Sequence, residues 1–179
     1  MNQSINEKVK SKINEDLSPT RNLTGLHLKI VAAIAIIWSL FQLWYASPFP
    51  FMFNIGMFKG LPARAIHLGF ALTLAFLIYP ISKGKKISIF DILICFIAAS
   101  SCLYIYFFYD QLVDRGGVLL NIMIGENFNL PIELIIGSCG ILILLEATRR
   151  AIGLPLVIIA ISFLLFSYFG RYAPEIISH

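Results

Sequence analysis

Three carboxylates stand out among the few ionisable residues in the apolar part of this 179-residue chain. Asp91, Glu133 and Glu146 each lie close to one end of a long apolar run. Deep in a bilayer, a carboxylate would be a candidate for ion coupling or proton relay, because its cost must be offset by function. Near an interface the same group complements a helix dipole. We expect this role for Glu133, which follows Pro131 at a helix start, and an ion-path role is the alternative.

The three histidines are too far apart for the chemistry that paired histidines carry. His27 is expected at the inner end of the first apolar run, His67 at the outer mouth of the second, and His179 at the outer terminus. Haem ligation in a membrane subunit needs two histidines at matching depth on facing helices. No cysteine or carboxylate cluster joins these histidines at metal-ligand spacing. The sequence therefore predicts no catalytic, cofactor or metal site.

The three cysteines all fall inside apolar runs, which favours a packing role. Cys95 and Cys102 are seven residues apart. On one helix they would be roughly 10 Å apart, too far for a disulfide. Cys139 lies in another run. We expect all three to be packing residues.

The elements that carry these residues are five apolar runs, over 28–44, 63–81, 87–109, 130–145 and 152–169. Each is close to the roughly 20 residues that a helix needs to cross a bilayer. The chain is 58% hydrophobic and 13% charged, against about 45–50% and 25% in soluble domains. The runs do not alternate apolar and polar residues as barrel strands do. These patterns predict an all-α integral membrane protein with about five spans, of which the short fourth is the weakest.

The distribution of Lys and Arg predicts the orientation, because cytoplasmic loops keep the excess. Ten of the 14 lie in the N-terminal tail, at Lys29 just after it, in the connection 82–86 and at Arg149 and Arg150. The N-terminus is therefore expected inside and the C-terminus outside, in the inner (plasma) membrane. Residues 1–27 form a polar cytoplasmic tail without a signal-peptide core. Residues 28–171 form the membrane domain, and 172–179 form a short outer tail.

Polar and small residues in the spans are expected to serve helix packing. Gln42 and Ser138 can hydrogen-bond to neighbouring backbones. Gly137 and Gly140 are expected to let helices approach closely. The aromatic loop 47–60 is predicted to lie in the outer interface. These observations indicate a lipid-facing scaffold that performs no chemistry by itself.

Three stretches resemble the N-terminal part of fused permeases of the tripartite ATP-independent periplasmic (TRAP) transporters, in the branch that works with TAXI-type binding proteins. They are RAIHLGF at 64–70 running on to LIYP at 77–80, LEATRRAIG at 145–153, and YFGRYAPEIISH at 168–179. The resemblance covers roughly residues 21–179. The fused relatives continue beyond this point into a large transport part, so the chain is expected to be either a separate small subunit or a fragment of a longer permease.

The resemblance implies that the transporter has a small and a large membrane part with different roles. The large part would hold the substrate and coupling-ion sites and move, while the small part would surround it as a fixed scaffold. A secreted binding protein would deliver the substrate, an organic acid. The partners implied are thus a large TRAP permease subunit or the rest of a fused chain, a secreted binding protein and the bilayer.

The candidate partner-interface or topology residues come from these stretches: Arg64, His67, Glu146, Arg149, Arg150, Tyr168, Gly170, Tyr172 and Pro174. Arg149 and Arg150 are expected to be topology anchors in the cytoplasmic loop, with contacts to the large subunit as the alternative. Glu146 can pair with either arginine, as in an exposed helix.

The remaining candidates lie toward the outer side. Arg64 and His67 are expected to be interfacial residues that reach the headgroups, with partner contact as the alternative. Gly170 is expected to end the fifth helix as a C-cap. No residue is expected to bind substrate.

Two other classes of protein remain as alternatives. A stand-alone channel or transporter would need mid-span polar residues, which are missing from the runs. A membrane assembly factor, or an accessory subunit of a respiratory or other membrane complex, would have the same scaffold character with a different partner.

Overall fold

The computed structural model describes residues 20–21, 23–58, 60–81, 87–116, 118, 121–124 and 128–170, with the backbone alone over 121–124 and 128–130. In this part of the chain there are six helices and one short hairpin. The helices are α2 (Gly25–Ala46), α3 (Phe49–Phe53), α4 (Gly60–Ile78), α5 (Ile89–Asp114), α6 (Ile132–Ala151) and α7 (Leu154–Phe169). The hairpin pairs β1 (Asn121–Ile124) with β2 (Phe128–Pro131) in antiparallel register.

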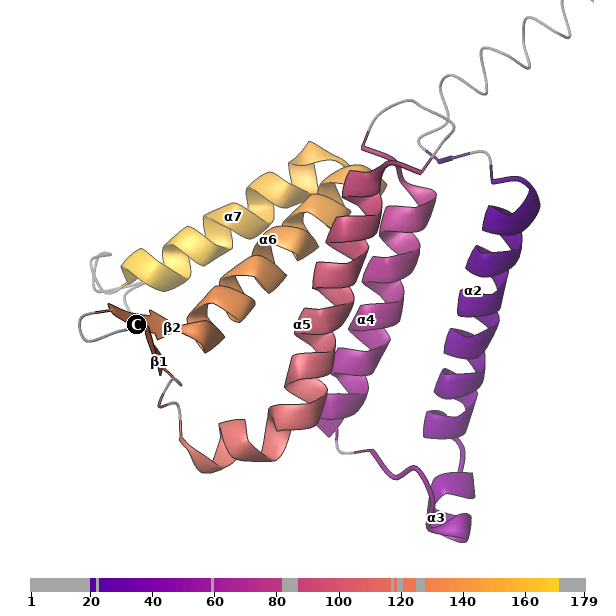
Figure 1. The fold of residues 1–179 in the computed structure, drawn as a ribbon, viewed down its shortest axis with the longest axis horizontal. Helices are drawn as coiled ribbons and strands as arrows, with labels where there is room; N and C mark the ends of the chain where they lie inside the picture. The colour runs from indigo at the N-terminus through magenta and orange to yellow at the C-terminus, as the bar shows by residue number, and fades with distance from the viewer. Residues whose placement is uncertain are drawn as a thin grey trace, which may run out of the picture.

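Helices α4 and α5 lie side by side in the middle of the molecule (Figure 1). Helix α2 stands on one side of α4 and leads into the short α3 at its far end. On the other side, α6 and α7 run together and lean away from α5, and the hairpin lies at their lower end. The C-terminal end of α6 and the N-terminal end of α5 thus come together at one end of the molecule.

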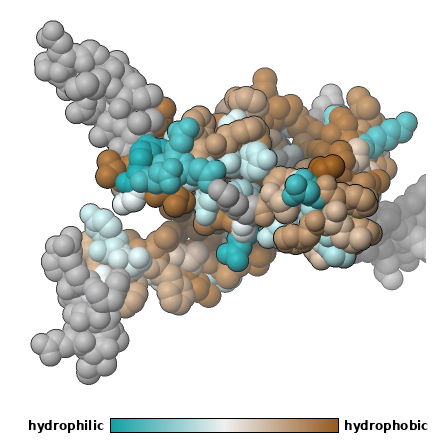
Figure 2. Space-filling model, turned by 90° about the horizontal axis from the view of Figure 1, so that it is seen from below, coloured by the Kyte–Doolittle hydropathy of each residue, from teal (hydrophilic) through white to brown (hydrophobic). Residues whose placement is uncertain are grey.

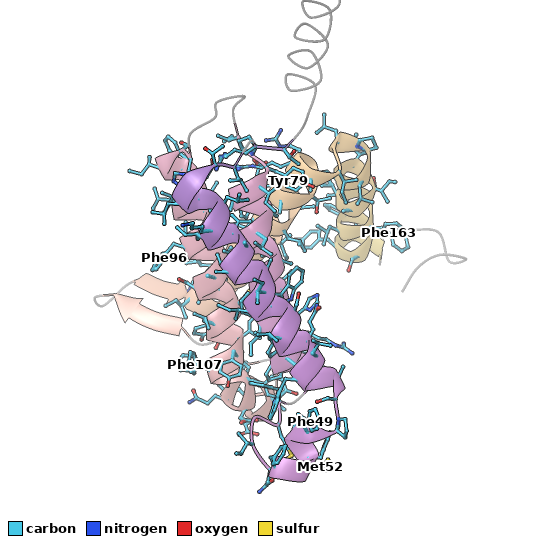
Figure 3. All side chains as sticks on the ribbon, turned by 90° about the vertical axis from the view of Figure 1, so that its right-hand side faces the viewer. Phe49, Met52, Tyr79, Phe96, Phe107 and Phe163 are labelled. Carbon is cyan, nitrogen blue, oxygen red and sulfur yellow. The ribbon has the colours of Figure 1, made fainter. Side chains whose placement is uncertain are left out.

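Three of the described helices, α2, α4 and α5, are long and apolar enough to cross a membrane. Many of their large apolar side chains are exposed. In Figure 2, which views the molecule from below, brown covers most of the coloured atoms, beside one larger teal patch. Phe96 and Phe107 of α5 extend outward from the bundle, as Phe163 of α7 does (Figure 3), and each is about 70% exposed. The predicted membrane-embedded, helical character is confirmed at this level.

Helices α6 and α7 are not among those three. Helix α6 has 20 residues, with an acidic side chain in its first turn and two basic side chains in its last, and α7 has 16 residues. A fourth and fifth crossing remain predictions. The two helices are divided at Gly153, whose φ of +114° is strained for other residues, followed by Pro155 in the first turn of α7.

The fourth helix extends further than its apolar pattern indicated, and this changes the setting of two predicted residues. The predicted run ended at 145, but α6 continues to Ala151, so Arg149 and Arg150 lie in its last turn. Nothing before Gly153 breaks the helix, because the polar residues at its end are all compatible with helical backbone. The prediction that both arginines lie in a loop is wrong, and the hairpin before α6 was not predicted.

The core lies between α4, α5 and α6 and consists of the buried residues Leu72, Phe76, Ala98, Cys102 and Ala147. Helices α4 and α5 approach closely at Gly69, where an added Cβ would lie 3.3 Å from the Cβ of Cys102. Helix α6, by contrast, stands away from its neighbours at Gly137 and Gly140, where an added Cβ would meet nothing within 4 Å. These two glycines line a cavity of about 300 Å³. The expectation that they bring helices close together is wrong in this chain, and Gly69 has that role.

Candidate functional site

The most highly charged region of the described structure is a cluster in which Asp91 lies between two arginines. One carboxylate oxygen of Asp91 accepts a hydrogen bond from Arg21 Nη2 at 2.7 Å, and the other accepts one from Arg150 Nη1 at 2.7 Å. The three side chains are 1–2% exposed. We refer to Arg21, Asp91, Glu146, Arg149 and Arg150 as the ion cluster.

Asp91 is positioned by the start of α5. Ser88 caps this helix, and its hydroxyl accepts a hydrogen bond from the backbone N–H of Phe90. Asp91 follows in the first turn, where a negative charge is favoured by the helix dipole. The local sequence at the start of α5 therefore determines where the Asp91 carboxylate lies, independently of its contacts with the arginines.

Arg21 joins the segment before α2 to the end of α4. Its backbone N–H donates to the carbonyl of Ile78 at 2.8 Å, and its Nη1 donates to the carbonyl of Leu77 at 3.2 Å. The last carbonyls of a helix have no partners within the helix. Arg21 thus supplies donors to the end of α4 and a charge to Asp91 at the same time.

Arg150 connects α6 to both α4 and α5. Its Nη1 lies 3.4 Å from the carbonyl oxygen of Tyr79, just after α4, and its guanidinium lies 5.0 Å from the ring centre of Phe76. Its Nε donates to Glu146 at 2.8 Å. This side chain is therefore buried and has several partners, unlike a residue on an exposed helix face. Its expected role as a topology anchor stays a prediction.

Arg149 differs from its neighbour. It is 44% exposed and makes a two-pronged ion pair with Glu146, at 2.7 and 2.8 Å. Glu146 therefore pairs with both arginines. Glu146 lies just after the predicted fourth span. The hydrogen bonds from Arg149 and then Arg150 lower the pKa of its carboxyl to about 2, although burial acts in the opposite direction.

The ion cluster joins helix ends, and its carboxylate oxygens are already engaged. Both oxygens of Asp91 and both oxygens of Glu146 already accept hydrogen bonds from arginine. Arg21 Nε and Arg150 Nη2 are buried without a hydrogen-bond partner in the described part of the chain. Within that same part, no group of three or more His, Cys, Asp or Glu is placed to hold a metal ion.

A second ion pair links the far ends of α5 and α6. Glu133, in the first turn of α6, pairs with Arg115 at 2.5 Å and accepts a hydrogen bond from the Tyr104 hydroxyl at 3.2 Å. Its side chain is 6% exposed. The predicted position at a helix start is confirmed, and the ion pair adds a role in joining the two helices that the sequence had not indicated.

His67 lies in α4, seven residues after its start, and contacts α2. Its predicted place at the outer mouth of the span stays a prediction. Its ring lies edge-on to Trp38, with 5.0 Å between ring centres. Trp38 Nε1 donates to His67 Nδ1 at 3.3 Å, and Gln42 Nε2 lies 3.0 Å from the same nitrogen. Gln42 therefore bonds to a side chain, where a backbone partner was expected. Arg64, one turn earlier, is exposed.

The other predicted residues are not brought into either cluster. Tyr168 is 76% exposed on α7, and Gly170 is the C-cap of that helix as predicted. Tyr172 and Pro174 lie outside the described residues.

Two of the three cysteines belong to the core region. Cys102 is buried in the core, and Cys95, also on α5, packs against that core. The expected packing role is confirmed for these two, and Cys139 is half-buried on α6.

Sequence reasoning missed two members of the ion cluster as site residues, Arg21 and Asp91. Arg21 was counted only as part of a basic tail, and Asp91 only as an interfacial carboxylate. A usable signal was present: the predicted topology placed Arg21, Asp91 and Arg150 at the same end of the helices. Opposite charges at matching depth are expected to pair, since an isolated charge there is costly.

The chain was compared with protein-family models, curated proteins and solved structures, and none of them matches it.

Proposed function

We propose that this chain is the small scaffold subunit, or scaffold part, of a binding-protein-dependent secondary transporter of the TRAP type that takes up organic acids. The transport site would lie in a separate large permease part, and a secreted binding protein of the TAXI class would deliver the substrate. The proposal rests on the resemblance of three sequence stretches and on the way the chain uses its charges.

The observation that carries the proposal is that the carboxylates nearest the membrane are engaged in holding helices together. Asp91 binds two arginines, Glu146 binds two, and Glu133 binds Arg115 and Tyr104. An ion-coupled carrier needs carboxylates that can bind and release their ion. Carboxylates that are paired with arginines are expected in a scaffold, which keeps its shape while the transport part moves.

The proposal includes an orientation with the ion cluster on the cytoplasmic side. Residues Arg21, Tyr79, Asp91 and Arg150 meet at one end of the molecule, so they share one side of any membrane that the helices cross. The excess of Lys and Arg favours the cytoplasm for that side.

Reporter fusions provide the check on this orientation. Fusions after Lys85 and Arg150 should be active only for a cytoplasmic reporter, and fusions after Asn121 and His179 only for an external one. A cytoplasmic reporter that is active at His179 would contradict a crossing by α6 or α7, and with it the five-span arrangement.

Purification from native membranes tests the proposed assembly. The affinity-tagged chain should copurify with one larger membrane protein in equal amounts, and that protein should have about twice as many predicted spans or more. A gene for a secreted binding protein should accompany it. Subunits of a respiratory or other complex in place of such a permease would favour the accessory-subunit alternative, and a chain purified without any partner would contradict both.

A further inference from the structure

The contact between α2 and α4 fixes the proton of His67 on the nitrogen that points away from the contact. The indole N–H of Trp38 can only donate, so His67 Nδ1 must accept. Gln42 approaches the same nitrogen with its amide nitrogen, which donates as well. A neutral imidazole carries one proton. In this arrangement the proton is therefore on Nε2.

The Nε2–H group needs an acceptor, and none is present among the described residues. The His67 side chain is exposed, and its printed hydrogen bonds all involve Nδ1. Residue 67 lies seven positions after the start of α4, roughly 10 Å along the helix axis. Helix α4 is one of the helices able to cross a membrane. If α4 enters the hydrocarbon region at its start, residue 67 lies where water is scarce, and an N–H group without an acceptor there costs a few kcal/mol.

The surroundings of His67 suit another helix. On α2, the residues Ala35, Ser39, Gln42 and Ala46 follow one another at helical spacing of four, three and four, so they share one face. All but Ala35 are exposed. Small residues and an amide on one face allow close helix approach and interhelical hydrogen bonds.

Charge complementarity indicates what that helix should carry. Arg64 lies three residues before His67 on the same side of α4 and is also exposed. Its guanidinium and the Nε2–H of His67 are both donors, and a carboxylate accepts from both. A lipid phosphate at headgroup level suits Arg64, but His67 lies roughly two helical turns deeper than the start of α4.

We propose that the edge formed by Arg64 and His67 of α4 with Ser39 and Gln42 of α2 docks a helix of a second membrane protein, which places a carboxylate opposite His67 Nε2. If the proposed function is right, this helix belongs to the large permease part. The docking edge and the chemistry of its partner stand on these contacts, and only the identity of the partner rests on the proposed function.

Site-specific photocrosslinking in native membranes tests this edge. A benzophenone side chain at Ser39 should crosslink to a membrane span of a second protein that contains Asp or Glu within one turn of the crosslinked residue. The control position is Phe96, which is on α5, 70% exposed and directed away from the bundle (Figure 3). It should crosslink to lipid. Crosslinks from Ser39 only to lipid, to a second copy of this chain, or to a span without a carboxylate would overturn the inference.

Two substitutions test the hydrogen bond itself. His67→Phe keeps a ring but removes Nε2–H, and we expect the yield of the Ser39 crosslink to fall about three- to tenfold, as for the loss of one interhelical hydrogen bond. Since His67→Phe also affects Trp38 and Gln42, Arg64→Gln is the second variant, and it should lower the same yield. An unchanged yield in both variants would contradict the proposed carboxylate.

The outcomes separate this inference from the proposed function. A permease that copurifies but crosslinks at Phe96 and not at Ser39 would refute the edge and leave the function intact. A Ser39 crosslink to a carboxylate-bearing span of an unrelated membrane protein would support the edge and refute the function.

Discussion

Replacing Asp91 with Asn is expected to produce the largest loss of stability of any single substitution in this chain. The substitution removes the negative charge that lies between Arg21 and Arg150, both of which are almost fully buried. Breaking a buried ion pair by removing one partner costs about 3–5 kcal/mol, because the remaining charge stays uncompensated. Here two charges remain. We expect the thermal unfolding midpoint of the purified protein in detergent to fall by on the order of 10 °C.

Asp114→Asn is the matched control for that experiment. Asp114 is the last residue of the same helix, and it is exposed. Removing this charge should change stability by no more than about 0.5 kcal/mol. The double variant Asp91→Asn with Arg150→Gln should lose less stability than the sum of the two single variants, because the pair acts as a unit. Equal midpoints for the Asp91 and Asp114 variants would show that the ion cluster does not hold the helices together.

The second large effect is expected from Arg150→Lys, although this change keeps the charge. Arg150 contacts Asp91 with Nη1 and Glu146 with Nε, and its guanidinium faces the Phe76 ring. A lysine ammonium is a single point and cannot take both positions. Losing one charge-assisted hydrogen bond costs about 1.5–3 kcal/mol. We expect a clear fall in the unfolding midpoint and in the yield of monodisperse protein.

Arg149→Lys is the natural comparison, since the same substitution is made one residue away. Arg149 pairs only with Glu146 and is 44% exposed. An exposed pair of this kind is worth about 0–1 kcal/mol, so this variant should unfold close to the wild type. Midpoints close to that of the wild type in both variants would mean that the positive charge of Arg150 is sufficient, as expected for an anchor of topology. A loss of partner binding in Arg149→Lys at unchanged stability would indicate a contact to the large subunit.

The helices could be predicted from the sequence because their apolar runs are long and their ends carry recognisable signals. Ser88 before α5 and Gly153 with Pro155 between α6 and α7 are such signals. The end of α6 was harder to predict, because hydropathy falls at Glu146 while the helix continues through Arg150. Hydropathy indicates whether a residue is surrounded by lipid or by water. A helix can continue from lipid into water, so a fall in hydropathy does not mark its end.

The ion cluster could be predicted only in part, since it joins residues far apart in sequence. The pairing of Glu146 with the two arginines follows from helical spacing alone. The bonds of Asp91 to Arg21 and Arg150 span 70 and 59 positions. They depend on three helix ends meeting at one level, which a count of charges on each side of a membrane suggests but does not specify. The contact of His67 with Trp38 and Gln42 likewise joins two helices whose facing sides the sequence does not specify.

Uptake into proteoliposomes is the most direct test of the claim that this chain is a scaffold whose transport site lies elsewhere. Three preparations are needed: this chain alone, the copurified large permease alone, and both together, each with the secreted binding protein, labelled organic acids and an imposed ion gradient. The account predicts saturable, gradient-driven uptake only when both membrane proteins are present. Saturable uptake by this chain alone would contradict it, and Glu133, the carboxylate beside the cavity between α4, α5 and α6, would then be the first candidate for an ion site.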